Sequence, residues 1–259
     1  MSDPTSPWGP LLVPVGAARR WRVGPWELGV RRGEGEWTFT AFPLGSDPLA
    51  TELEVAQEGE PADVPEDATV LRVTTAEDDP ASLRPAGADR SMVVRPEVPL
   101  LLVDAVELYV STPLWAQLEV DGVRVLDLPT WRPSDTFFGA DPTDGVLAYA
   151  GRTTARREPQ GLVPSPARVV TRVRIENRAS TPLAVERIEL PVPLLSLWSL
   201  PDGRLWTCDV VIERTADGLV RPPRYDAARA PGEGAVRAAE PRLVADPSFL
   251  HRAFGAILG

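Results

Sequence analysis

Short runs of alternating hydrophobic and polar residues constrain the fold of this chain more than any other feature. In residues 169–177 (VVTRVRIEN), Val169, Thr171, Val173 and Ile175 share one face, and the residues between them, polar except for Val170, lie on the other. A period of two is typical of a half-buried antiparallel strand. Roughly a dozen such runs between Arg20 and Tyr225 predict an all-β fold, an antiparallel β-sandwich or a barrel-like sheet in one or two lobes.

Turn residues separate these runs at short intervals. Asp121-Gly122 lies between two alternating runs, and both turn positions of such a hairpin favour a positive φ, which Asp and Gly tolerate. Further turns are expected at Pro201-Asp202-Gly203 and at Asp217-Gly218. Proline, with 29 of 259 residues, removes backbone donors and breaks helix interiors. The chain is therefore expected to form short strands joined by many turns.

Changes in composition divide the chain into six expected segments. These are a Pro-rich N-terminal segment (1–18), an N-terminal β-lobe (19–76), an acidic, Pro-containing loop (77–90), a main β-domain (91–226), a flexible linker (227–245) and an amphipathic helix (246–259). The linker contains few large apolar residues. The helix is expected because Asp246 suits an N-cap and Pro247 suits the first helical position.

Several classes of chemistry are excluded by composition. All 27 basic residues are arginines, so a P-loop lysine, a pyridoxal Schiff base and a Ser–Lys dyad cannot form. One His and one Cys cannot supply a zinc or iron site, and we expect no metal and no cofactor. The net charge of −10 disfavours nucleic acid, and Arg172 and Arg174 alternate with neighbouring residues as on a solvated sheet face.

The sequence predicts a soluble cytoplasmic protein. Cys208 has no cysteine to pair with, which suits a reducing compartment. The N-terminus lacks a basic region and is interrupted by prolines, unlike a signal peptide. No apolar run approaches the roughly 18 residues of a membrane span.

The stretch TWRPSDTFFGADPTDG, residues 130–145, contains the candidate ligand-binding residues Trp131, Arg132, Asp135, Phe137 and Phe138. One interpretation is structural, with the aromatic rings filling the edge of the core. A second is a binding rim, where the rings stack on a sugar and the guanidinium binds a small anionic ligand. A third takes acids of this stretch, among them Asp141 and Asp144, as a hydrolytic carboxylate pair or as calcium ligands.

A catalytic Cys–His pair is disfavoured by its placement in the sequence. Cys208 lies in an apolar-rich strand pattern, where a cysteine is usually a small core residue. His251, the one histidine, lies in the predicted C-terminal helix beyond the expected linker, which is a poor way to hold catalytic geometry. A Ser–His–Asp triad would need the same histidine.

Several short motifs carry a resemblance to a known family. The stretch from YVSTPLW through RPSDTFFG and AYAGRTTARRE to ERIELPVPLLSLW and GRLWTCDVVIER resembles an uncharacterised prokaryotic family, a domain-of-unknown-function group. The resemblance covers roughly residues 95–215 and brings no assigned activity, ligand or catalytic residue. The acidic loops and the predicted C-terminal helix fall outside it.

The predicted C-terminal helix gives the most specific functional expectation. A helix this short is marginal alone in water, so its apolar stripe must pack against the chain itself, a second copy, another protein or a membrane. A membrane is disfavoured because Arg252 is its one cationic side chain. We therefore expect a non-enzymatic interaction or scaffold protein that docks a protein partner or larger assembly through Phe249, Leu250, Phe254, Ile257 and Leu258. The alternatives are a sugar- or anion-binding module at the 130–145 loop and a carboxylate-dependent hydrolase.

Overall fold

The computed structural model describes residues 8–45, 53–61, 63–75, 79–139, 145–162 and 165–244. Within these ranges the protein consists of β-strands and two 3-10 turns, which confirms the predicted all-β class. The chain forms two compact units. Unit 1 comprises Met1–Pro85, Leu114–Trp131 and Pro164–Ala167, and unit 2 comprises Ala86–Pro113, Arg132–Val163 and Arg168–Gly259.

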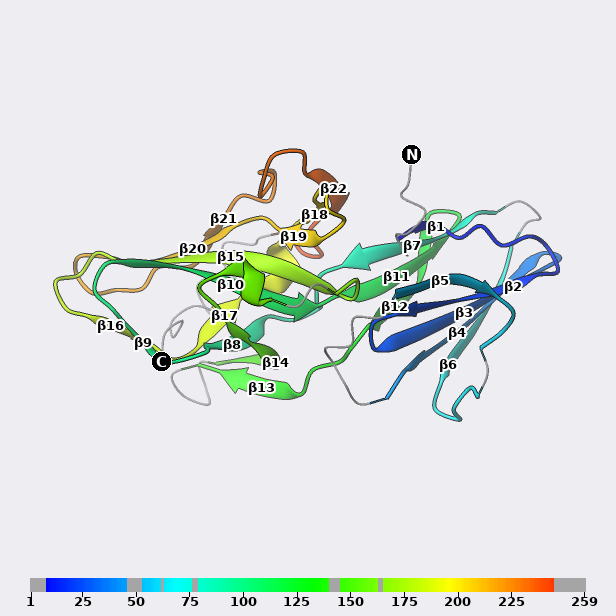
Figure 1. Ribbon diagram of the computed structural model, residues 1–259, viewed down its shortest axis with the longest axis horizontal. Helices are drawn as coiled ribbons and strands as arrows, with labels where there is room; N and C mark the ends of the chain where they lie inside the picture. The colour runs from blue at the N-terminus through cyan, green and yellow to red at the C-terminus, as the bar shows by residue number, and fades with distance from the viewer. Residues whose placement is uncertain are drawn as a thin grey trace. The chain divides into compact units, whose positions relative to one another are not determined.

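Unit 1 is built from two sheets that share one core (Figure 1). The five-stranded sheet has the order β5 (Leu53–Glu58), β2 (Ala18–Val23), β3 (Trp26–Gly33), β4 (Glu36–Pro43) and β6 (Thr69–Thr74). The four-stranded sheet has the order β1 (Gly9–Pro10), β7 (Ala81–Ala86), β11 (Trp115–Val120) and β12 (Val123–Pro129).

The core of unit 1 follows from alternation along its strands. Trp37, Phe39 and Ala41 are buried on one side of β4, and the first two rings stack with centroids 6.0 Å apart. The predicted hairpin at Asp121-Gly122 joins β11 to β12, with φ of 49° and 73° at the two turn residues. Left-handed backbone of this kind is the reason for glycine at the second position.

Unit 2 contains a seven-stranded sheet, a four-stranded sheet and a two-stranded ribbon. The largest has the order β21 (Arg224–Tyr225), β20 (Val210–Arg214), β15 (Arg168–Asn177), β19 (Leu205–Thr207), β18 (Leu197–Ser199) and β22 (Val236–Ala239), with β10 (Ala105–Pro113) also paired to β15. The second has the order β13 (Asp135–Phe138), β14 (Val146–Ala155), β8 (Met92–Pro96) and β17 (Ile188–Leu190). The ribbon pairs β16 (Leu183–Val185) with β9 (Leu100–Leu102), and the 3-10 turns η1 and η2 span Pro159–Gly161 and Val192–Leu194.

Strand β15 organises unit 2 because three other strands pair with it. It is antiparallel to β10 along its whole length, whereas β19 and β20 are both parallel to it on the other edge. The sheet is therefore mixed rather than purely antiparallel. The predicted inward face is confirmed, since Val169, Thr171, Val173 and Ile175 are fully buried.

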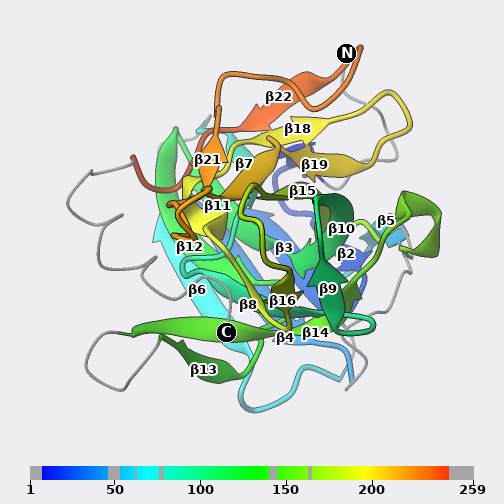
Figure 2. The same ribbon diagram turned by 90° about the vertical axis from the view of Figure 1, so that its left-hand side faces the viewer.

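Two expected segments need correction. The loop predicted at 77–90 contains β7, in which Ala81 and Leu83 are buried in the core of unit 1. The linker predicted at 227–245 contains β22, which pairs with β18 (Figure 2). In both places polar, proline and small residues obscured a strand whose pairing is made by backbone groups. The expected boundary at 77–90 also missed that the β11–β12 hairpin belongs to unit 1.

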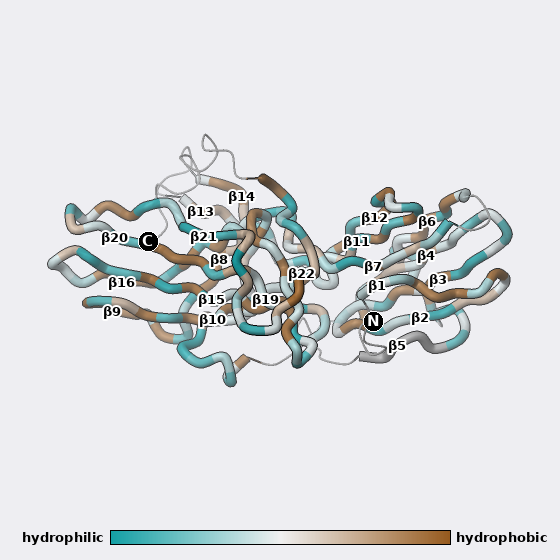
Figure 3. Tube along the Cα trace, turned by 90° about the horizontal axis from the view of Figure 1, so that it is seen from above, coloured by the Kyte–Doolittle hydropathy of each residue, from teal (hydrophilic) through white to brown (hydrophobic). Residues whose placement is uncertain are grey.

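Hydrophobic and hydrophilic stretches alternate along the strands of both units (Figure 3). No helix long and apolar enough to cross a membrane occurs in the part of the chain that the structure describes. The predicted helix at 246–259 lies outside the described residues.

Candidate functional site

The candidate binding residues of the 130–145 stretch lie at and before the β13–β14 hairpin. Asp135 and Phe137 belong to β13, an edge strand, and pair with Tyr149 and Leu147 of β14. Because successive side chains of a strand point to opposite faces, Phe138 lies on the other face from Phe137. The hairpin thus separates the predicted aromatic residues rather than gathering them.

The structure surrounds Asp135 with arginines. Its carboxylate accepts a hydrogen bond from Arg90 Nη1 at 3.1 Å and lies 3.7 Å from Arg132 Nη2. The Arg90 guanidinium stands 5.3 Å from the ring centroid of Tyr149, whose hydroxyl donates to Asp89 at 3.0 Å. Burial, and then this hydrogen bond, raises the pKa of Tyr149. Two arginines and two acids balance here, which leaves no excess charge for an anionic ligand.

The aromatic residues of this stretch have three different environments. Phe138 is 1% exposed, and Arg187 lies over its ring at 5.5 Å. Phe137 is 43% exposed and rests on Gly145, where a Cβ atom would come within 1.9 Å of the ring. Trp131, the last residue of its segment in unit 1, is half-buried, and its Nε1 has no hydrogen-bond partner among the described residues. The structural interpretation thus fits Phe138 fully and Phe137 only in part.

The metal and catalytic hypotheses find little in the described residues. Asp141, Asp144 and His251 lie outside them. No group of three or more His, Cys, Asp or Glu in the described ranges could hold a metal ion. Cys208 is buried, and its burial raises the pKa of the thiol, a shift that Ser196 opposes. A buried neutral thiol suits a core position.

Glu189 is a buried acid that sequence reasoning missed. It lies on β17 opposite Val93 of β8 and is 0% exposed. Neither carboxylate oxygen has a hydrogen-bond partner in the described part of the chain, although the nearby Ser91 side chain favours the charged form. Burial raises the pKa of Glu189 to about 7. The pattern ERIEL gave no sign that its second glutamate, Glu189, is buried, because acidic residues in strands usually lie on the solvent-exposed face.

A larger polar site lies on the outer face of the seven-stranded sheet. It is a cavity of about 470 Å³, here called the arginine groove, lined by nine residues that include Arg172, Arg174, Asp209, Val211, Arg224 and Arg229. An adjoining hollow of about 340 Å³ shares four of its lining residues. Sequence reasoning took the β15 arginines for a solvated face. They do point outward, but strands distant in sequence bring further arginines beside them.

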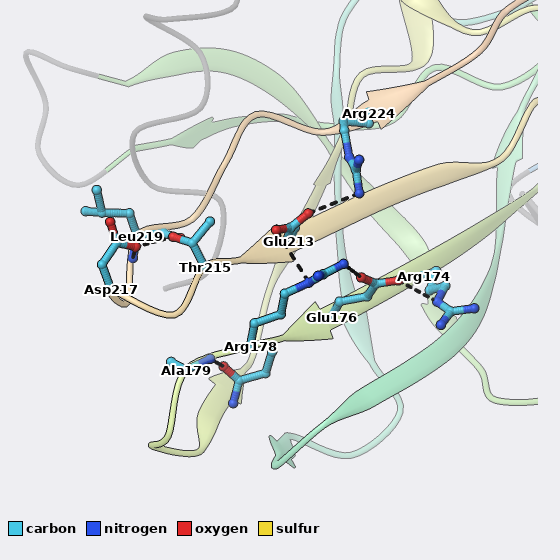
Figure 4. A network of polar contacts seen from close by, with 10 residues as sticks. Arg174, Glu176, Arg178, Ala179, Glu213, Thr215, Asp217, Leu219 and Arg224 are labelled. Atoms are coloured by element: carbon cyan, nitrogen blue, oxygen red, sulfur yellow. Dashed lines mark hydrogen bonds and ion pairs between the residues drawn. The ribbon is translucent and has the colours of Figure 1, made fainter.

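Ion pairs run along one side of the groove (Figure 4). Glu176 and Glu213 are register partners on β15 and β20, and Arg178 lies 3.0 Å and 3.5 Å from their carboxylates. Arg174 pairs with the first acid at 2.8 Å and Arg224 with the second at 3.1 Å. Hydrogen bonding from Arg178 is the main cause that lowers the pKa of Glu176. These ion pairs hold Arg174 and Arg224 in place at the groove.

The segment before the predicted docking helix is held on unit 2. Arg237 of β22 stacks over Trp198 at 4.3 Å. Arg242 donates two hydrogen bonds to the Gly87 carbonyl, at 3.0 Å and 2.7 Å, and the Leu243 amide donates to the carbonyl of Pro193 at 2.9 Å. The chain is thus anchored almost to the end of its described part. The candidate docking residues Phe249, Leu250, Phe254, Ile257 and Leu258 lie outside that part.

The sequence comparisons agree with the resemblance of the central motifs and extend it. No curated protein matches the chain. No solved structure matches it either. The model of the family described as "Protein of unknown function (DUF432)" matches residues 7–258, which is nearly the whole sequence. The chain is therefore a member of the DUF432 family.

Proposed function

We propose that the protein is a non-enzymatic cytoplasmic interaction protein that docks a separate protein partner through its C-terminal segment, residues 246–259. The observation that carries this proposal is the anchor at Arg242 and Leu243, which ties the preceding chain to Gly87 and Pro193. A flexible linker of the expected length would let the segment range widely. The anchor instead gives it a defined starting point on unit 2.

The number of residues between the anchor and the apolar stripe limits where docking can occur. Phe249, the first apolar anchor, follows Leu243 by six residues, which span at most about 20 Å when fully extended. The first anchor, Phe249, must therefore dock within that distance of Leu243. Anchors at this spacing suit the grooves that bind amphipathic helices, and the ordered segment before them lowers the entropy lost on binding.

The test compares the full chain with a variant in which the five anchors Phe249, Leu250, Phe254, Ile257 and Leu258 are changed to Ser. Its matched control changes the polar residues Ser248 and Arg252 to Ala and Gln. Affinity purification from the native cell, light scattering and thermal melting are measured for each.

Docking to another protein predicts that the anchor variant loses a stoichiometric partner that the control retains, while its melting temperature stays unchanged. A variant that melts several degrees lower as a monomer would show that the segment completes the core of its own chain. Loss of a dimer without loss of another protein would identify a second copy as the partner. Either of these two results would overturn the proposal.

A further inference from the structure

The arginine groove derives from the register of four strands. Glu107 of β10 pairs with Arg174 of β15, which pairs with Val211 of β20, which in turn pairs with Arg224 of β21. Paired residues of neighbouring strands point to the same face of a sheet. This cross-strand row therefore places one arginine on each side of Val211. The Cα atoms of the two arginines lie roughly 10 Å apart, because adjacent strands are about 4.8 Å apart.

The valine forms a low floor between taller side chains. Arg172, two residues before Arg174 on the same face of β15, is held by Asp209, which accepts from its Nε at 3.0 Å and from its Nη2. Glu176 and Glu213 bound the opposite side. Arg229, from the segment after β21, also lines the cavity. The floor is thus surrounded by charged side chains, four of them arginines.

Several guanidinium donors in the groove remain available. Among the described residues, Arg174 bonds Glu176 through Nε, which leaves both terminal nitrogens, and Arg224 bonds Glu213 through Nη2, which leaves Nε and Nη1. Arg229 makes no ion pair with any residue that the structure describes. Guanidinium groups bind carboxylate and phosphate oxygens in forked geometry, so these donors match an oxyanion placed over Val211.

The charge balance favours an anion here against the trend of the whole chain. The groove is lined by four arginines and three acids, whereas the chain carries a net charge of −10. A cavity of about 470 Å³ is the size of a small-molecule site, and its floor and walls offer no aromatic ring among the lining residues for stacking a sugar.

We propose that the arginine groove binds a small multivalent oxyanion, carrying phosphate or carboxylate groups, between Arg174, Arg224 and Arg229 above Val211. The ligand accepts hydrogen bonds from the donors that the acids of the sheet leave unused. The described lining residues of the groove all lie outside the C-terminal segment, so the test of this proposal is independent of the test of the docking proposal.

Titration calorimetry of the full chain with pyrophosphate and with citrate tests the site and separates its two chemistries. Binding of either at low ionic strength, weakened by added salt, is expected. Arg229→Gln removes the arginine that holds no ion pair in the sheet, and it should weaken binding about tenfold without changing the melting temperature. Arg152→Gln, at an exposed arginine outside the groove, is the matched control and should bind as the wild type does.

A second variant keeps the test decisive. Val211→Glu places a carboxylate on the floor between the two arginines and should abolish binding by occupying the site. Failure of both anions to bind the wild type would overturn the proposal. Equal weakening by Arg229→Gln and Arg152→Gln would also overturn it, because it would show general attraction to positive charge.

Discussion

Glu176 and Glu213 lie side by side as register partners on the parallel strands β15 and β20, and Arg178 bridges their carboxylates. Like charges directly opposite in a sheet are destabilising. Arg178 between them, with Arg174 and Arg224 on the outer sides, offsets this repulsion. Without an arginine to bridge them, two acids at this position would repel each other and weaken the pairing of β15 with β20.

Replacing Arg178 by Gln should lower the melting temperature near neutral pH, because the two carboxylates then repel each other. In the wild type the pKa of Glu176 lies below its usual value, so its stabilising effect is present above the unfolded pKa and is lost as the pH falls through the folded pKa. In the variant this component of acid sensitivity should be smaller, because only Arg174 is then left to lower the pKa of Glu176. Melting curves between pH 3 and 7 measure it, with Arg152→Gln, at an exposed arginine, as control. Identical curves for wild type and Arg178→Gln would contradict the bridging role.

The two neighbouring phenylalanines of β13 should differ sharply. Phe138→Ala removes a fully buried ring and should cost about 3–5 kcal/mol of unfolding free energy. Phe137→Ala removes a ring that is 43% exposed, and its cost should stay below about 1 kcal/mol. Denaturant unfolding of both variants measures the difference. Comparable losses for the two changes would show that the edge strand packs differently.

Glu189 should make unit 2 less stable as the pH rises. Its pKa is about 7 in the folded protein and near the ordinary value of a glutamate when unfolded. Between those values the unfolded chain releases a proton that the folded chain keeps, so stability falls with rising pH and the loss is complete above about pH 7. The difference between the two pKa values corresponds to a loss of about 3 kcal/mol in unfolding free energy across this pH range.

Glu189→Gln should therefore stabilise the protein at pH 8 and have little effect at pH 4, as chemical denaturation at both values would show. Glu186→Gln, at an exposed acid of the same segment, is the control. A variant that is less stable at pH 8 would mean that the ionised carboxylate is stabilised rather than penalised.

Cys208 should not react with iodoacetamide in the folded protein. The side chain is fully buried, and burial raises the pKa of its thiol, so both access and thiolate are lacking. Alkylation followed by mass spectrometry should show modification only when denaturant unfolds the chain. Rapid labelling under native conditions would place the thiol at a mobile or open position instead.

The sequence predicted the fold class and the local hairpins because their signals are local. Alternation in residues 169–177 identified the buried face of β15, and Asp121-Gly122 identified a turn. Alternation cannot reveal which strand lies beside which. Arg174 and Arg224 are fifty residues apart, and only the register of β15, β20 and β21 brings them to one groove. The β22 strand was missed for a related reason, since its four residues, Val236–Ala239, are too few to show an alternating pattern.

The division of the chain among the two units affects how the protein can be made and cut. Each unit is assembled from three separate stretches, and unit 1 takes its β11–β12 hairpin from the middle of the sequence. During synthesis, unit 1 must wait for Ala167 to leave the ribosome, by which time the first two stretches of unit 2 have already emerged. No single proteolytic cut or truncation releases either unit whole. Neither unit is therefore a contiguous stretch of sequence that could be fused whole to another protein.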